Sequence, residues 1–421
     1  MQQLYALLIV WTSAFSFVHA QSTPTVSPCS HDAIMARHLT ENSKAELEQS
    51  AREAFIRDFI TKMNSDNLRK DLLDATYTIP VVLHVFHNGD DGKIDMEQVQ
   101  SGMDIINDDF NGLNEGWDSI DPAFDSIKGT LDIQFCLASI DPEGNPTTGV
   151  NYYDNEEAMY NNVDLFEYAW DNYQYMNIYL PKYAFNEPSN FTAYAYYPST
   201  NGSDNNRGGV VYSSIRWGYG SLSELEAGQD WASVGTHEVG HWLDLRHTFE
   251  GGCGPFGDLV DDTPPTLGSG IELTGCNNND FSCGVATNGE NFMDYNHDCK
   301  KMFTQGQVDR MIAALHLPSR LPLWSEANLV ATGCASEVTS TRPVSKERIQ
   351  VYPNPATNWI NFDFETTPER LFIFDVNGRT IFDGEIDQRH FQLNTFLLDK
   401  GMCFYRATFA NRTVSGKFIL Q

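Results

Sequence analysis

The residues best suited to chemistry in this 421-residue chain lie between positions 236 and 247. His237, Glu238 and His241 form a His-Glu-x-x-His run, and His247 follows six residues after the second histidine. On a helix, side chains four positions apart share a face, so His237 and His241 can direct their imidazoles at one metal ion. A helix that ends soon after His241 lets the chain turn and bring His247 round as a third ligand. Three neutral imidazoles with one open position suit a catalytic Zn²⁺ that keeps water as its fourth ligand. The alternative is three unrelated histidines on a surface helix.

A second suggestive stretch, residues 291–295 (Asn-Phe-Met-Asp-Tyr), lies further along the chain. Met293 in a tight turn could form an apolar floor beneath the histidines without binding the metal. Tyr295 could offer its hydroxyl to the metal or to a developing oxyanion. Both could instead be ordinary core residues, but their place downstream of the histidine run favours the functional interpretation.

Residues 237–247 resemble the metzincin signature His-Glu-x-x-His-x-x-Gly-x-x-His at all but one position, and Met293 resembles the Met-turn of that clan. Residues 247–253 (His-Thr-Phe-Glu-Gly-Gly-Cys) and 291–295 are similar to the pappalysin-like (ulilysin-like) endopeptidases, and the resemblance runs from about residue 78 to 318. It implies an α+β metzincin catalytic domain, in which a twisted sheet carries a zinc-binding active-site helix. It also implies a zinc metalloendopeptidase in which Glu238 acts as general base and then general acid.

Asp244 occupies the one signature position that departs from the family, which has glycine there. Glycine is favoured because the helix ends in a left-handed conformation. Aspartate tolerates that conformation when its short side chain bonds locally, and we expect a cost of about 1 kcal/mol. The three histidines and Glu238 are retained, so we predict an active enzyme and not a pseudoenzyme.

All eight cysteines follow residue 20, and an even number in an exported protein indicates disulfides. Four of them cluster beyond the histidine run, where spacing alone leaves three pairings open. The family resemblance implies Cys253–Cys283 and Cys276–Cys299.

Cys29 lies far from that cluster and has two possible roles. It could pair with Cys136, or its thiolate could take the open position on zinc and keep a proenzyme inactive. The family's propeptides carry such a cysteine, although the neighbours of Cys29 differ from the usual Arg-Cys-Gly. Cys334 and Cys403 could also form a bridge.

The resemblance further implies a calcium site in the loop after the zinc helix. The matching positions offer carboxylate and carbonyl oxygens, which suit Ca²⁺: Asp258, Val260, Asp262 and Thr263. A solvated acidic loop is the alternative.

The chain before residue 77 is predicted to be removable. Residues 1–20 are typical of a secretory signal peptide, because an apolar run from Leu7 to Val18 ends at the small Ala20. That run is too short to span a membrane. Residues 21–76 form a propeptide with helical periodicity, and an exposed basic stretch at 68–73 would suit proteolytic removal.

The catalytic domain is predicted to span 77–334. Apolar, β-branched segments predict strands at 78–86, 133–137, 176–180 and 208–213, and an amphipathic pattern predicts a helix at 95–110. The segment 185–207 lacks such a pattern and is expected to be a loop.

Residues 335–347 are predicted to be a linker, and 348–421 a small all-β sandwich of short alternating strands with a turn at Asn377-Gly378. Val-Tyr-Pro-Asn-Pro-Ala at 351–356 and the closing strand at 416–420 resemble the C-terminal sorting domains of type IX secretion cargo. That resemblance implies the secretion machinery as a partner, and a secreted or cell-surface enzyme exported through the periplasm of a Gram-negative bacterium. A carbohydrate- or partner-binding sandwich is the alternative.

The formal charge of −30 excludes a nucleic-acid partner, because nothing here would neutralise phosphates. No stretch after the signal peptide is long enough for a transmembrane anchor. The sequence therefore favours a secreted zinc endopeptidase, made as a latent proenzyme and acting on polypeptides. The alternative is a surface adhesion or binding protein that retains the fold and the metal without turnover.

Overall fold

The structure, a computed structural model, divides into two compact units, Met1–Ala335 and Ser336–Gln421. Each is considered by itself. The residues it describes are 29–41, 44–65, 69–73, 75–184, 193–223, 233–254, 257–268, 281–296, 299–335, 349–364, 366–375, 379–396, 398, 400–409 and 412–421. The predicted signal peptide, most of the linker and the Asn377-Gly378 turn lie outside them.

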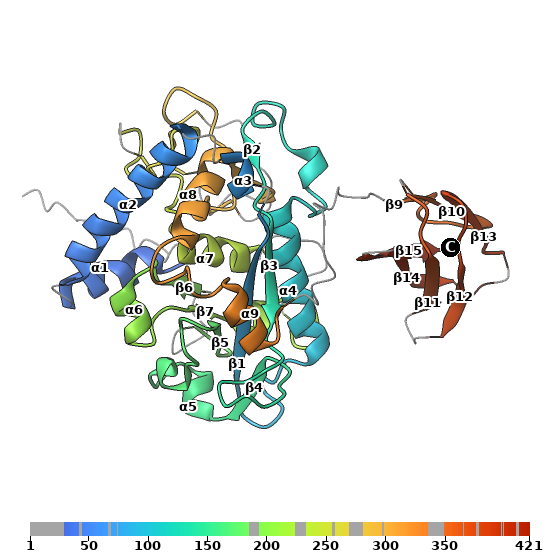
Figure 1. The fold of residues 1–421 in the computed structure, drawn as a ribbon, viewed down its shortest axis with the longest axis horizontal. Coiled ribbons are helices and arrows are strands. Elements are labelled where there is room, and N and C mark those ends of the chain that lie inside the picture. The colour runs from blue at the N-terminus through green and yellow to red at the C-terminus, as the bar shows by residue number, and fades with distance from the viewer. Residues whose placement is uncertain are drawn as a thin grey trace, which may run out of the picture. The chain divides into compact units, whose positions relative to one another are not determined.

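A mixed sheet of mostly parallel strands forms the centre of the larger unit (Figure 1). Its strand order in the described chain is β3-β1-β5-β7-β6, and β4 pairs with β1 on the same side as β3. Only β6 runs antiparallel to its neighbour, β7. The bounds are β1 Tyr77–His87, β3 Ile133–Leu137, β4 Val150–Asp154, β5 Met176–Leu180, β6 Ala193–Ala195 and β7 Val210–Tyr212.

Strand β1 is buried on both faces, as its continuous apolar sequence predicts. Alternate residues such as Ile79 and Val81 join the main core with residues of helix α4 (Met96–Asn111), among them Met103. The intervening Phe86 packs in a second cluster on the other face, which is rich in tyrosine. The sheet is therefore a rigid platform covered on both sides.

Helices and short elements complete the larger unit. The α-helices are α1 His31–Glu41, α2 Ala45–Ser65, α3 Arg69–Leu73, α5 Glu156–Met159, α6 Thr200–Asp204, α7 Val234–Trp242, α8 Gln305–Leu315 and α9 Glu326–Thr332. The 3₁₀ turns are η1 Trp117–Ser119, η2 Leu165–Tyr168 and η3 Ser214–Arg216, and β2 (Lys128–Gly129) pairs with β8 (Phe303–Thr304).

The predicted strands and the helix at 95–110 are found, whereas β4, β6 and α6 were not anticipated. Strand β6 and helix α6 lie inside the segment 185–207, which was expected to be a loop. At three residues, β6 is too short to show a strand pattern of its own, and it is defined by pairing with β7.

The N-terminal segment is helical, as predicted, and α2 packs along α8 (Figure 1). Ile56 of α2 is buried in an apolar cluster with Ala313 and Ala314 of α8. In the basic stretch at 68–73, Lys70 is exposed as expected, whereas the side chain of Arg69 is partly buried and forms an ion pair with Asp309 at 2.5 Å.

The disulfides correct two expectations. Cys136 is bonded to Cys334, so neither the Cys29–Cys136 nor the Cys334–Cys403 pairing is formed. This bond links β3 to the end of the larger unit. The Cys253–Cys283 pairing is as expected. Cys299 is also disulfide-bonded, while its expected partner Cys276 lies outside the described residues.

The smaller unit is the predicted all-β sandwich. One sheet has the order β13-β10-β9 and the other β12-β11-β14-β15. Buried residues of both sheets, including Phe362 and Phe418, share one core. The bounds are β9 Ile349–Tyr352, β10 Trp359–Phe364, β11 Arg370–Asp375, β12 Thr380–Glu385, β13 His390–Asn394, β14 Gly401–Phe409 and β15 Arg412–Leu420. Across both units, none of the helices that the structure describes has the length and apolar character needed to cross a membrane.

Candidate active site

Helix α7 carries the His-Glu-x-x-His run through the core, and every residue from Val234 to Trp242 is buried. The helix ends one residue after His241, as the sequence predicts. The amide of Leu245 bonds back to the carbonyl of Gly240 at 2.9 Å, and Asp244 takes the left-handed conformation with φ 72°. This turn returns the chain so that His247 faces the helix.

The three histidines direct their Nε2 atoms at one point. His241 Nε2 lies 3.1 Å from His237 Nε2 and 3.2 Å from His247 Nε2. The outer Nδ1 atoms of His237 and His241 donate to the carbonyls of Phe292 and Leu245 at 2.7 and 2.8 Å. These bonds fix the tautomer that leaves both Nε2 lone pairs free for a metal. Burial holds the pKa values of His237 and His241 well below the usual range, which keeps both rings neutral. The donor set fits Zn²⁺.

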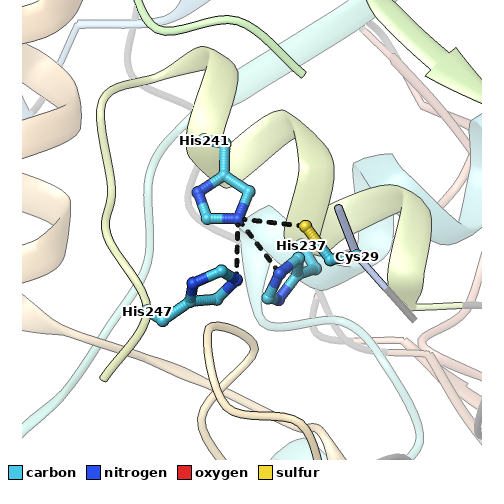
Figure 2. A group of neighbouring side chains, drawn as sticks. All are labelled: Cys29, His237, His241 and His247. Carbon is cyan, nitrogen blue, oxygen red and sulfur yellow. Dashed lines mark hydrogen bonds between the residues drawn. The ribbon is translucent and has the colours of Figure 1, made fainter. Parts of the chain in front are cut away.

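Cys29 supplies a fourth donor atom. Its buried Sγ lies 3.5 Å from His241 Nε2, and the four donor atoms all lie within 4.8 Å of one another (Figure 2). The N-terminal segment is held there by its backbone, because the amide of Ser30 bonds to the carbonyl of Ala193 in β6 at 3.0 Å. Three imidazole nitrogens and one cysteine sulfur are donor types found together in closed, four-coordinate zinc sites.

Glu238 is wholly buried beside the histidines. Burial raises the pKa of its carboxyl from 4.5 to about 8. The pKa of the Cys29 thiol is also raised, first by burial and then by the negative charge of Glu238. A carboxylate in such a water-poor setting is a strong proton acceptor.

Met293 and Tyr295 lie where the sequence analysis expected them. Met293 is fully buried and packs against α7. The contact is so close that a Cβ added to Gly240 would lie 2.5 Å from its Sδ. The Tyr295 ring lies edge-on to His247, with centroids 4.8 Å apart. The Tyr295 hydroxyl donates to the backbone carbonyl of Cys29 at 3.2 Å. The N-terminal segment therefore engages this hydroxyl.

Three further residues at the site were not anticipated. His31 stacks on His241 with centroids 3.9 Å apart. Asp32 Oδ2 lies 3.2 Å from Nδ1 of His247 and completes the outer contacts of the three histidines. Lys300 is buried with its Nζ 3.4 Å from His237 Nδ1. A sequence signal existed only for the first two, which follow Cys29 closely.

Asp244 requires a correction. Its side chain does not bond locally but is fully buried between two arginines, with Oδ1 2.6 Å from Arg52 Nε and Oδ2 2.7 Å from Arg310 Nη2. The left-handed backbone was predicted correctly, whereas the means of accommodating it was not.

The loop that was expected to bind calcium comes after His247 in the chain. Asp258 is buried, and its Oδ2 atom and the Oδ1 atom of Asp262 have no hydrogen-bond partner within the described loop. Burial raises the pKa of Asp258 to about 7. Thr263 is also buried, and the amide of Val260 bonds to Asp258 Oδ1 at 3.1 Å. Unpaired buried carboxylate oxygens are costly unless a cation neutralises them, so the loop fits a hard cation.

Comparisons with known proteins agree with this geometry. Residues 159–316 match the pregnancy-associated plasma protein-A peptidase family, and residues 350–421 match the secretion system C-terminal sorting domain. An extracellular metalloprotease of Arthroderma gypseum is 28% identical over 246 residues, covering 56% of this chain and 72% of the relative. Extracellular metalloprotease 1 of Coccidioides posadasii is 42% identical over 24% of this chain and 35% of its own length. The chain thus spans about a third of the length of some curated relatives that it matches.

Solved structures of Tannerella forsythia mirolysin are also similar. Mature mirolysin in complex with a cleaved peptide is 29% identical, with a TM-score of 0.52 over 61% of this chain and 98% of mirolysin. A promirolysin mutant is 26% identical, with a TM-score of 0.57 over 71% of this chain and 97% of promirolysin. These likenesses confirm the α+β metzincin fold and the pappalysin resemblance.

Proposed function

We propose that this chain, which carries a pappalysin-type peptidase domain followed by a secretion-system sorting domain, is a secreted zinc endopeptidase made as a latent proenzyme. The observation that carries the proposal is the convergence of three histidine Nε2 atoms and the Cys29 thiol, with Glu238 buried beside them. Mirolysin, which is similar over nearly its whole length, has been seen with a cleaved peptide.

His237, His241 and His247 would hold Zn²⁺, which when bound supplies an activated water and a Lewis acid for the peptide carbonyl. Glu238 accepts the proton of the attacking water and delivers it to the leaving amine. Tyr295 is close enough to the histidines to donate its hydroxyl to the developing oxyanion once the Cys29 carbonyl no longer accepts it. Met293 supports α7 from below.

Latency follows from the position of Cys29. Its thiolate would fill the position that the attacking water needs, so the segment before residue 77 acts as a propeptide. The promirolysin match covers about a tenth more of this chain than the mature mirolysin match, which supports a propeptide of this kind.

The domain limits follow the same proposal: a signal peptide at 1–20, a propeptide at 21–76, a catalytic domain at 77–334, a linker at 335–347 and a sorting domain at 348–421. The sorting domain would engage type IX secretion machinery, and the enzyme would act outside a Gram-negative cell, released or surface-attached. We also propose that Asp258 and Asp262, with Val260 and Thr263, bind a structural Ca²⁺.

The test compares the full chain with Glu238→Ala, after removal of the propeptide in both. The parent should contain zinc and cleave a denatured protein, and a chelator should stop the cleavage. Glu238→Ala should keep its zinc and its fold but lose at least about 10²-fold in rate, the usual contribution of a general base. The matched control Glu97→Ala, at an exposed position of α4, should behave as the parent does.

Two results would reject the proposal. Turnover in Glu238→Ala at the rate of the parent would remove Glu238 from the mechanism. A parent that holds zinc but cleaves no polypeptide would favour the adhesion or binding protein.

A further inference from the structure

A cluster of six charged side chains joins helix α2 of the N-terminal segment to the rest of the larger unit. Helix α2 contributes Arg52 and Glu53. The other four come from the turn after α7, the residues that follow it, and α8 (Gln305–Leu315): Asp244, Arg246, Glu250 and Arg310. Beside this cluster, α2 rests on α8 through the apolar contact around Ile56 (Figure 1).

The side chain of Arg52 is buried against residues outside the N-terminal segment. Its Nε lies 2.6 Å from Asp244 Oδ1, and the two side chains are only 7% and 0% exposed. Its guanidinium carbon lies 4.8 Å from the ring centroid of Tyr197, and Nη1 donates to the carbonyl of Pro198 at 3.3 Å. A buried charge with this many partners is strongly selective for arginine, because its planar fork can pair and stack at the same time.

Glu53, the next residue, is negatively charged and contacts two arginines. It accepts from Arg310 Nη2 at 2.8 and 2.9 Å and from Arg246 Nη2 at 3.0 Å. Arg310 in turn donates to the Asp244 carboxylate and, through Nε, to the Asp244 carbonyl at 2.8 Å. The charges therefore alternate in sign along the cluster. The residues outside α2 form a surface that is complementary to an adjacent Arg-Glu pair on a helix.

The charges of the cluster remain balanced when α2 is removed. Removing α2 takes one positive charge, Arg52, and one negative charge, Glu53, away from this cluster. Asp244 then keeps Arg310 at 2.7 Å, and Arg246 keeps Glu250 at 2.9 Å. None of the four charged side chains of the cluster that remain is stranded, although a stranded charge is the usual penalty for breaking a buried pair.

We propose that Asp244, Arg246 and Arg310 form a docking surface for the propeptide of this chain, which they recognise through Arg52 and Glu53 independently of the Cys29 thiol. Glycine at position 244 would relieve the left-handed backbone but would remove the carboxylate that receives Arg52. The departure of Asp244 from the signature thus adds a second attachment for the propeptide. Naming this segment a propeptide rests on the proposed function, whereas the docking contact itself does not.

The test measures amide hydrogen exchange in α2 of the full chain, in a Glu238→Ala background that prevents self-cleavage. Arg52→Ala and Asp244→Gly should each speed exchange in α2 at least about tenfold, because each removes the buried ion pair between Arg52 and Asp244 that holds α2 in place. Asp58→Ala is the matched control, since it breaks an exposed pair with Lys62 on the same helix and should change nothing. Asp244→Gly is informative because glycine fits the turn, and unchanged exchange in β1 shows that the larger unit stays folded.

Cys29→Ser tests independence from the thiol. In that variant α2 should keep its protection within about twofold. The proposal is overturned if Arg52→Ala and Asp244→Gly leave α2 as protected as Asp58→Ala does, or if Cys29→Ser alone releases α2 fully. Because exchange needs neither zinc nor turnover, a failure of the proposed enzymatic function would not alter this result.

Discussion

Two glycines of α7 provide a matched test of the packing beneath the histidines. Gly240 lies directly before His241, and an added Cβ there would meet Met293 Sδ at 2.5 Å. An added Cβ on Gly235 would lie 3.6 Å from Ile106, which is an ordinary contact. Both glycines are buried in the same helix, so the two alanine variants differ mainly in the clash with Met293.

The expected magnitudes follow from two opposing effects. Alanine is a better helix former than glycine by about 0.8–1.0 kcal/mol, and both variants gain from this. Overpacking a core side chain costs about 1–3 kcal/mol, and only Gly240→Ala incurs it because Met293 is fully buried and cannot swing into solvent. The thermal midpoint of Gly240→Ala should therefore lie roughly 2–10 °C below that of Gly235→Ala.

Differential scanning calorimetry of the full chain in the Glu238→Ala background gives both midpoints without self-digestion. Zinc release to a chromogenic chelator gives a second readout, and it should quicken only in Gly240→Ala as His241 shifts. Equal midpoints and equal release rates would show that Met293 does not support the helix.

Three further outcomes are expected. Burial lowers the pKa of His84 from 6.5 to about 4, so its contribution to stability is present above pH 6.5 and is lost as the pH falls toward 4. Between pH 7 and pH 4, His84→Gln should therefore lose less stability than the parent. An equal loss in the two proteins would contradict this. Replacing Cys136 and Cys334 by serine should cost about 2–5 kcal/mol in the larger unit, because the bond closes a loop of 198 residues, while Cys403→Ser in the other unit serves as the control. Added Ca²⁺ should raise the thermal midpoint of the parent but not of Asp262→Ala, and a parent that does not respond would reject the calcium site.

Local rules predicted much of the site. The His237–His241 spacing is a property of one helix. The end of that helix after His241 was predictable because the chain must turn there for His247 to face the same metal. The left-handed backbone at Asp244 was predictable for the same reason, since it depends on the neighbouring turn. The alternation of apolar residues likewise predicted the all-β sandwich, although β12 and β13 were not identified individually.

Tertiary contacts account for what was missed. The Cys136–Cys334 bond joins positions 198 residues apart, and no local pattern selects it over Cys29–Cys136. Strand β6 is three residues long and exists through its pairing with β7. Lys300 reaches the histidines from a separate loop, without a motif to mark it.

Asp244 shows how a correct local prediction can conceal a longer-range role. Viewed along the sequence, the residue is a tolerable substitute for glycine whose cost is about 1 kcal/mol. In the structure, its carboxylate contacts both Arg52 of α2 and Arg310 of α8. If α2 is removed as we propose, Asp244 loses Arg52 and keeps Arg310, so it has one partner that leaves and one that stays. Arg310 is the partner that stays, and its own second contact, Glu53, leaves together with Arg52. Under this proposal, the pairwise departure would let a buried charge serve a temporary attachment without destabilising the part of the chain that remains.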